Sequence, residues 1–109
     1  MSDAASMEAV AQLIPVAQDA GMSLMHMALA FVTSHPAVSA AIIGPRTLEQ
    51  LDGLLAGAET VLDDEVLDRI DAIVPPGVDV APLEGAAYAP PAIAQAQLRR
   101  RPVGQRAAA

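Results

Sequence analysis

The sequence predicts a piece of an α/β protein, mostly helical as an isolated chain and with at most one short strand. Four segments carry apolar residues at three- and four-residue spacing, the period of a helix, and they flank a continuous apolar run at 40–43. Such a run without alternation is typical of a strand covered on both faces. One strand leaves its N–H and C=O groups without partners, at about 1–3 kcal/mol for each buried group. We therefore expect its neighbours to come from elsewhere in the fold or from another chain.

Composition narrows the classes of function. The 109 residues suffice for one small domain and carry a formal net charge of −7, which argues against nucleic-acid binding. There is no cysteine, so disulfides and thiolate catalysis are excluded. No apolar run reaches the length of a membrane span, and the N-terminus lacks the basic region of a signal peptide. We expect a cytoplasmic protein with no membrane partner.

The first helix is predicted over residues 6–20, and its apolar stripe comprises Met7, Val10, Leu13, Ile14 and Ala17. Pro15 lies inside this pattern and predicts a kink or a break, and Gly21 is a natural helix end. Ser23 can cap a second helix that runs to Ser34. That helix is apolar on nearly all sides, so we expect it to be buried on more than one face.

Residues 39–57 are the most informative stretch. The predicted strand Ala40–Ile43 ends at Gly44, Arg46 follows, and Thr47 begins a third helix, with Gln50 placed to complete a capping box. A glycine turn at a helix N-terminus attracts anions, and the planar fork of an arginine grips phosphate. The alternative is that Arg46 is a solvated loop charge and that Thr47 and Gln50 only cap the helix.

A fourth helix begins near Asp63, Asp64 and Glu65, where negative charge is favoured, and ends at 75–77. We interpret this acidic triplet as a charged first turn and not as a metal site. The sequence thus divides into a folded region, 1–77, and a proline- and alanine-rich tail, 78–109, that is extended or disordered. The tail holds four of the six arginines, and the net charge argues against reading them as a nucleic-acid arm.

Residues 23–77 resemble the C-terminal end of the aldo-keto reductases. The resemblance lies in 27–32, in 35–39, in 41–51 and in 67–71, and it covers about half of the chain closely. It implies the last helices and the eighth strand of a (β/α)8 TIM barrel, followed by an added helix. A complete barrel takes about 250 residues, so a gene fragment, a mis-called start and one half of a split gene are all open explanations.

The resemblance implies that Gly44, Arg46, Thr47 and Gln50 hold the adenosine 2′-phosphate of NADP(H). Arg46 would pair with the phosphate, Gly44 would let the backbone approach, and Gln50 would contact the adenosine end. Many members carry an asparagine four residues after this glutamine, where this chain has Leu54.

The resemblance also implies that the catalytic residues are missing. The family uses aspartate, tyrosine, lysine and usually histidine, whereas this chain has no lysine and its one tyrosine, Tyr88, lies in the tail. His26 and His35 match no catalytic position. We expect an NADPH-dependent carbonyl reductase present as a partial chain, whose partner is a complementary barrel chain. The alternatives are a non-catalytic helical module that packs on a partner chain, and a chain with no stable fold of its own.

Overall fold

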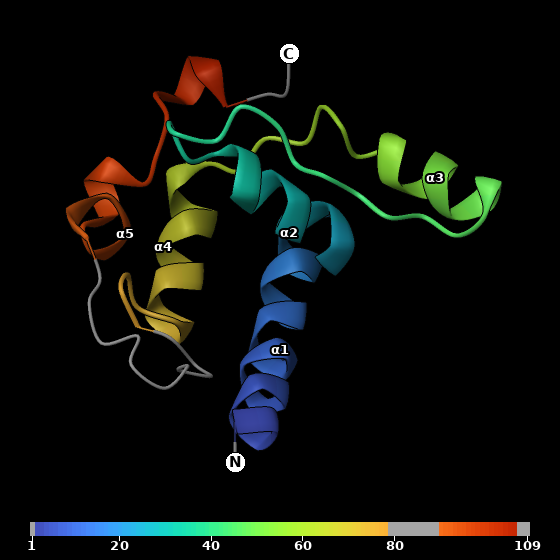
Figure 1. Cartoon of the computed structure of the whole chain (residues 1–109). Coiled ribbons are helices and arrows are strands. Elements are labelled where there is room, and N and C mark those ends of the chain that lie inside the picture. The colour runs from blue at the N-terminus through green and yellow to red at the C-terminus, as the bar shows by residue number, and fades with distance from the viewer. Residues whose placement is uncertain (1, 79–89, 107–109) are drawn as a thin grey trace.

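The computed structural model describes residues 2–78 and 90–106, and within these ranges the regular elements are all helical (Figure 1). The prediction of a mostly helical chain is confirmed. Four longer helices come first and three short turns follow: α1 (Ser2–Asp19), α2 (Leu24–Thr33), α3 (Leu48–Leu55), α4 (Asp64–Ile73), α5 (Pro91–Ala94), η1 (Ala96–Leu98) and η2 (Val103–Gln105). Helix α1 packs against both α2 and α4.

The predicted end of the first helix at Gly21 and the predicted cap of the second helix at Ser23 are confirmed. Gly21 adopts a φ of 76°, its N–H donates to the Gln18 carbonyl at 3.0 Å, and the Met22 N–H donates to the Ala17 carbonyl at 3.0 Å. This Schellman arrangement needs a positive φ, which glycine supplies without a steric penalty. The Ser23 hydroxyl then caps α2 by accepting from the His26 N–H at 3.1 Å.

Helix α1 is not broken at Pro15. It continues through the proline to Asp19, and it begins at Ser2 instead of residue 6. A proline in a helix removes one backbone hydrogen bond. The next two residues, Val16 and Ala17, are among the most buried of the chain. Their packing on α2 and α4 offsets that loss and keeps the helix in place.

The core is small and lies where α1, α2 and α4 meet. Among the described residues it contains seven buried apolar side chains, Val16, Ala17, Met27, Ala30, Leu62, Leu67 and Ile70. Helix α2 is less buried than its composition predicts, because only Met27 and Ala30 are buried while Met25 and Val32 are each 43% exposed. None of the helices among the described residues combines the length and the apolar character needed to cross a membrane.

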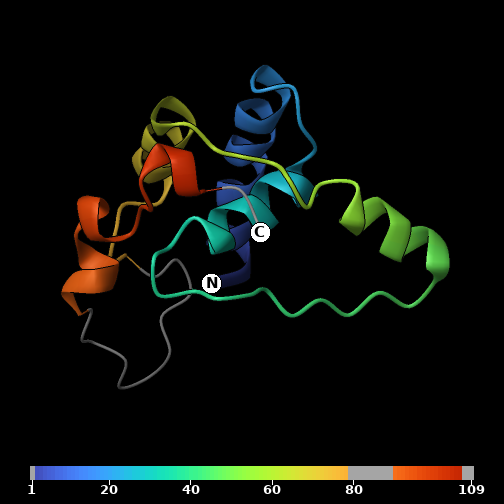
Figure 2. The same ribbon diagram turned by 90° about the horizontal axis from the view of Figure 1, so that it is seen from above.

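The prediction of a strand at Ala40–Ile43 is wrong for this chain. The segment has no strand assignment, and the Ile42 side chain is fully exposed (100%). Figure 2 shows residues 39–47 running alone along one side of the molecule. A strand is defined by its partners' hydrogen bonds, and in the described part of the chain no second segment pairs with it. The apolar run alone therefore could not produce a strand.

Helix α3 and its two connections form an arm, residues 39–61, that projects from the helical body (Figures 1 and 2). His26 of α2 holds this arm, because its Nε2 lies 2.7 Å from the Gly53 carbonyl oxygen. The imidazole also packs directly over the buried Gly57, where an added Cβ would collide with the ring. The arm therefore depends on a glycine at position 57.

We expect Gly57→Ala to destabilise the chain by about 1–3 kcal/mol, since the new methyl group displaces His26 and breaks its contact with Gly53. Urea unfolding followed by circular dichroism measures the change. Gly104→Ala is the matched control, because a Cβ at Gly104 meets no atom within 4 Å. Equal unfolding midpoints for the two variants would contradict this packing.

The tail differs from the extended segment that the sequence predicts. Residues 90–106 form three short helical turns and fold back onto α4 and the end of α2, with Arg106 buried. The physical reason is charge: the arginines of the tail find carboxylates on α4 and carbonyl oxygens at the end of α2. Residues 79–89 and 107–109, Tyr88 included, lie outside the described part of the chain.

Candidate functional site

The turn that leads into α3 is closed by two side-chain hydrogen bonds. Thr47 is the N-cap, and its Oγ1 accepts from the Gln50 N–H at 3.1 Å, as predicted. The return bond differs from a capping box, because Gln50 Oε1 accepts from the Arg46 N–H at 2.7 Å and not from that of Thr47. Both caps therefore fix the backbone of Arg46 at the N-terminus of α3.

An open hollow lies beside this turn. Gly44, Thr47 and Gln50 line it together with apolar groups, Met25, Ile43, Pro45 and Leu54 among them. A Cβ added to Gly44 would meet no atom within 4 Å, so the backbone there is open to approach. Three of the four predicted site residues thus line one hollow, and Arg46 lies between two of them in the chain.

The charges around the hollow are mixed. Arg46 is exposed and adjoins the N-terminus of α3, where the helix dipole adds positive potential. Glu49 lies in the first turn of α3 and also lines the hollow. Its carboxylate is favourable for the helix but opposes an anion at the same place.

The six arginines differ in what they contact. Arg69 pairs with Asp19 at 3.0 Å, and Arg99 and Arg100 pair with Asp71 at 3.8 and 2.7 Å. Arg106 pairs with Asp64 at 2.8 Å, and Arg101 donates to main-chain carbonyls. Among residues 2–78 and 90–106, no carboxylate pairs with Arg46. Arg101 and Arg46 both lack a carboxylate partner there, but only Arg46 also makes no side-chain hydrogen bond with another described residue.

The two histidines have structural roles. His26 contacts Gly53 and packs over Gly57, as described above. His35 Nε2 lies 2.9 Å from the Ala92 carbonyl oxygen, and its Nδ1 accepts from the Ala37 N–H at 3.0 Å. Within the described ranges, no group of three or more metal-ligating side chains is close enough to share an ion.

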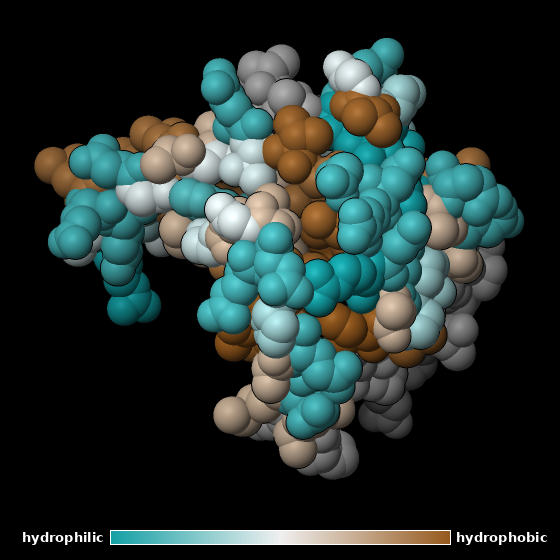
Figure 3. All heavy atoms as spheres, turned by 180° about the vertical axis from the view of Figure 1, so that it is seen from behind, coloured by the Kyte–Doolittle hydropathy of each residue, from teal (hydrophilic) through white to brown (hydrophobic). Residues whose placement is uncertain are grey.

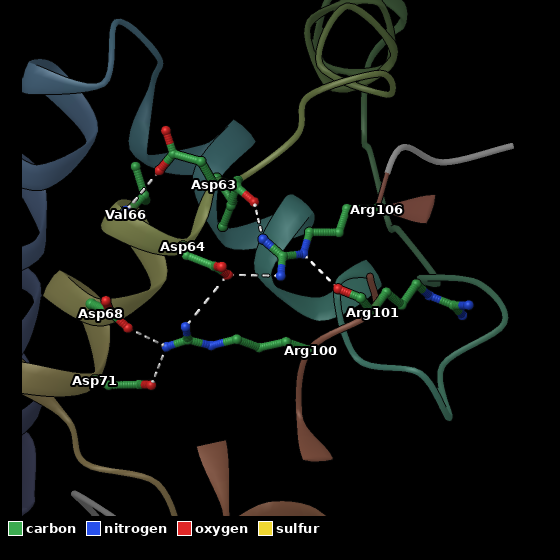
Figure 4. A network of polar contacts seen from close by, with 9 residues as sticks. Asp63, Asp64, Val66, Asp68, Asp71, Arg100, Arg101 and Arg106 are labelled. Atoms are coloured by element: carbon green, nitrogen blue, oxygen red, sulfur yellow. Dashed lines mark hydrogen bonds and ion pairs between the residues drawn. The ribbon is translucent and has the colours of Figure 1, made fainter. Parts of the chain in front are cut away.

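Sequence reasoning missed the polar network that the tail makes with α4 (Figure 4). Arg100 lies among Asp64, Asp68 and Asp71, at 3.6, 2.9 and 2.7 Å. Partial burial lowers the pKa of the Arg100 guanidinium, but hydrogen bonds with Asp68 and Asp71 outweigh burial and raise the pKa above its ordinary value. The signal was present in the sequence, because aspartates at 64, 68 and 71 share one face of a helix.

Comparison with known proteins shows the family of the chain. The aldo/keto reductase family matches residues 3–75, and the chain belongs to this family. This confirms the resemblance; its assignment to the C-terminal end of the barrel stays a prediction. A relative described as the uncharacterized oxidoreductase YrpG of Bacillus subtilis (strain 168) is 40% identical over 58 residues, which are 53% of this chain and 18% of the relative.

A second relative is the protein tas of Escherichia coli (strain K12), 33% identical over 66 residues, or 61% of this chain and 19% of the relative. The protein tas of Shigella flexneri matches to the same extent. The chain spans about a fifth of the length of these curated relatives. No solved structure matches the chain.

Proposed function

We propose that this chain is part of an NADPH-dependent carbonyl reductase and holds the adenosine 2′-phosphate end of the cofactor through Gly44, Arg46, Thr47 and Gln50. The observation that carries this proposal is Arg46, an exposed arginine at a helix N-terminus that pairs with no carboxylate of the described chain. A guanidinium in that position grips phosphate with two parallel hydrogen bonds. Family membership and the oxidoreductase relative support the reaction class.

The capping geometry leaves donors available to a phosphate. Thr47 Oγ1 accepts a hydrogen bond from Gln50, so its own hydroxyl proton remains able to donate. Gln50 uses its Oε1 on the Arg46 N–H, which leaves its side-chain NH2 as a donor. Gly44 adds the room that a close backbone approach requires. Four neighbouring residues thus offer donors and space in one turn.

When bound, NADPH supplies a hydride for carbonyl reduction. The residues of this chain bind and orient the far end of the cofactor. The chain contains no lysine, so the acid–base residues that the family uses come, in this proposal, from a complementary barrel chain. The isolated chain is therefore expected to bind without catalysing.

Binding of adenosine 2′,5′-bisphosphate tests the proposal, with adenosine 5′-monophosphate as the ligand that lacks the 2′-phosphate. We expect the bisphosphate to bind more tightly and Arg46→Ala to weaken it about 10- to 100-fold, the loss of a charge-assisted hydrogen-bonded pair. Isothermal titration calorimetry measures both ligands. Arg69→Ala is the control, since it removes an equal charge far from the turn. If the chain without substitutions binds the two ligands with equal affinity, the phosphate site is ruled out.

A second candidate function is a non-catalytic helical module that packs on a partner chain. The observation that favours it is the number of large apolar side chains at the surface, including Ile42 (100% exposed), Leu48 (79%) and Met7 (73%). Figure 3 shows brown apolar residues on several separate parts of one face. Binding that is independent of the 2′-phosphate and of Arg46 would favour this second function over the first.

A further inference from the structure

The arm that carries the candidate site is flanked by Val38 and Leu62, and an arginine of the tail donates to the main-chain carbonyl of each. Where the chain enters the arm, Arg101 Nη2 donates to the Val38 carbonyl at 2.6 Å. Where the chain leaves the arm, Arg106 Nη1 donates to the Leu62 carbonyl at 3.1 Å. Arg106 Nε also donates to the Arg101 carbonyl at 2.7 Å, so the two holds form one connected unit (Figure 4).

This unit is itself anchored to the helical body. The Arg101 backbone N–H donates to the Ser34 carbonyl at 2.7 Å, and its Nε donates to the Thr33 carbonyl at 3.2 Å, so that its charge lies at the negative end of α2. Arg106 is 4% exposed and pairs with Asp64 at 2.8 Å. Arg100 adds the ion pairs with α4. These contacts attach the tail to the helical body independently of its contacts beside the arm.

The arm has little else to fix its orientation. A hollow separates it from the end of α2, with Leu29, Thr33, Leu54 and Arg101 among its lining residues. The extended part of the arm pairs with no other strand of the described chain. Besides the arginines, His26 holds it at Gly53 and packs over the buried Gly57. The family match ends at residue 75, so both arginines lie outside the matched residues.

We propose that Arg101 and Arg106 are positioning residues that fix the arm, and through it the anion-binding turn, without touching the ligand. The arm-fixing role rests on the contacts above, and the effect on a phosphate rests also on the proposed function. A site held in one orientation loses less conformational entropy on binding than a mobile one, so its affinity is higher.

The cysteine-free sequence allows a direct test of the arm. Spin labels at Ala11→Cys on α1 and Asp52→Cys on α3 report the distance between body and arm by pulsed electron resonance, in the full chain without nucleotide. We expect one narrow distance distribution, which broadens in Arg101→Gln and remains narrow in Arg69→Gln. Circular dichroism checks that the helices persist. If Arg101→Gln fails to fold, Arg101→Lys replaces it and is expected to broaden the distribution less. A narrow distribution in the folded variant overturns the proposal.

Ligand binding then tests the positioning role. In Arg101→Gln, the preference for adenosine 2′,5′-bisphosphate over the 5′-monophosphate should fall about three- to tenfold, the effect expected for a loss of preorganisation. A broadened distance distribution together with an unchanged preference for the bisphosphate overturns the positioning role. Failure of the proposed function has a different signature: the unchanged chain shows no preference for the bisphosphate, while the distance measurement still decides whether the arginines hold the arm.

Discussion

Arg106→Met should lower the free energy of unfolding by about 3 kcal/mol. The guanidinium is almost fully buried and donates to the carbonyls of Arg101 and Leu62 as well as to Asp64. Methionine keeps the apolar stem but leaves two carbonyls without a donor, and hydrogen bonds from charged donors are worth about 1.5–3 kcal/mol each. Asp64 is largely exposed and returns to water at little cost. Urea denaturation measures the difference.

Arg69→Met is the control for this result. It removes the same group from an ion pair with Asp19 whose side chains are 42% and 66% exposed, and exposed pairs contribute about 0–1 kcal/mol. The two variants have equal formal charge, so a general effect of charge would appear in both. If both variants lose equal stability, the burial of Arg106 in this structure is incorrect.

Leu67→Ala is expected to cost about 2–5 kcal/mol, the usual range for a buried leucine. Leu67 lies near the middle of α4 and is 2% exposed, in contact with the core formed with α1 and α2. Alanine favours helix as well as leucine does, so the loss reports packing and not helix propensity. With only seven residues in the core, few neighbours can move to fill the cavity. A thermal or urea transition followed at 222 nm measures the effect.

Leu48→Ala makes the same chemical change at a position that is 79% exposed, and we expect a change within about 0.5 kcal/mol. Similar losses at both positions would mean that α4 does not pack as described. A parent chain that shows no cooperative transition would support the third expectation from the sequence, a chain without a stable fold of its own.

The sequence predicted the helices well because their signals are local. Caps such as Ser23 and Thr47 and the helix end at Gly21 depend on residues within a few positions, and these predictions are confirmed. The strand at Ala40–Ile43 failed because a strand requires partners that local sequence cannot supply. The short helical turns of residues 90–106 were not predicted for a related reason. These turns depend on ion pairs with α4, which join residues about 30 to 40 positions apart.

The candidate site was predictable in part. The hydrogen bond from the Gln50 N–H to Thr47 follows directly from their spacing, whereas the closure of Gln50 onto the Arg46 N–H does not. Spacing could not show that the other arginines are engaged and that Arg46 pairs with no described carboxylate. That contrast emerges only when distant segments are brought together, and it supports Arg46 more strongly than the motif does. The role of each residue toward a cofactor stays a prediction.

The contacts between Arg100 and the aspartates of α4 bear on how the chain distributes its charge. Residues 1–78 contain eleven of the thirteen acidic residues but only two of the six arginines. The tail therefore serves as a built-in counterion for an acidic body. Without it, Asp64, Asp68 and Asp71 would repel one another along one helix face, and dissolved cations would have to take its place. Solution ions and the tail thus compete for the same helix face.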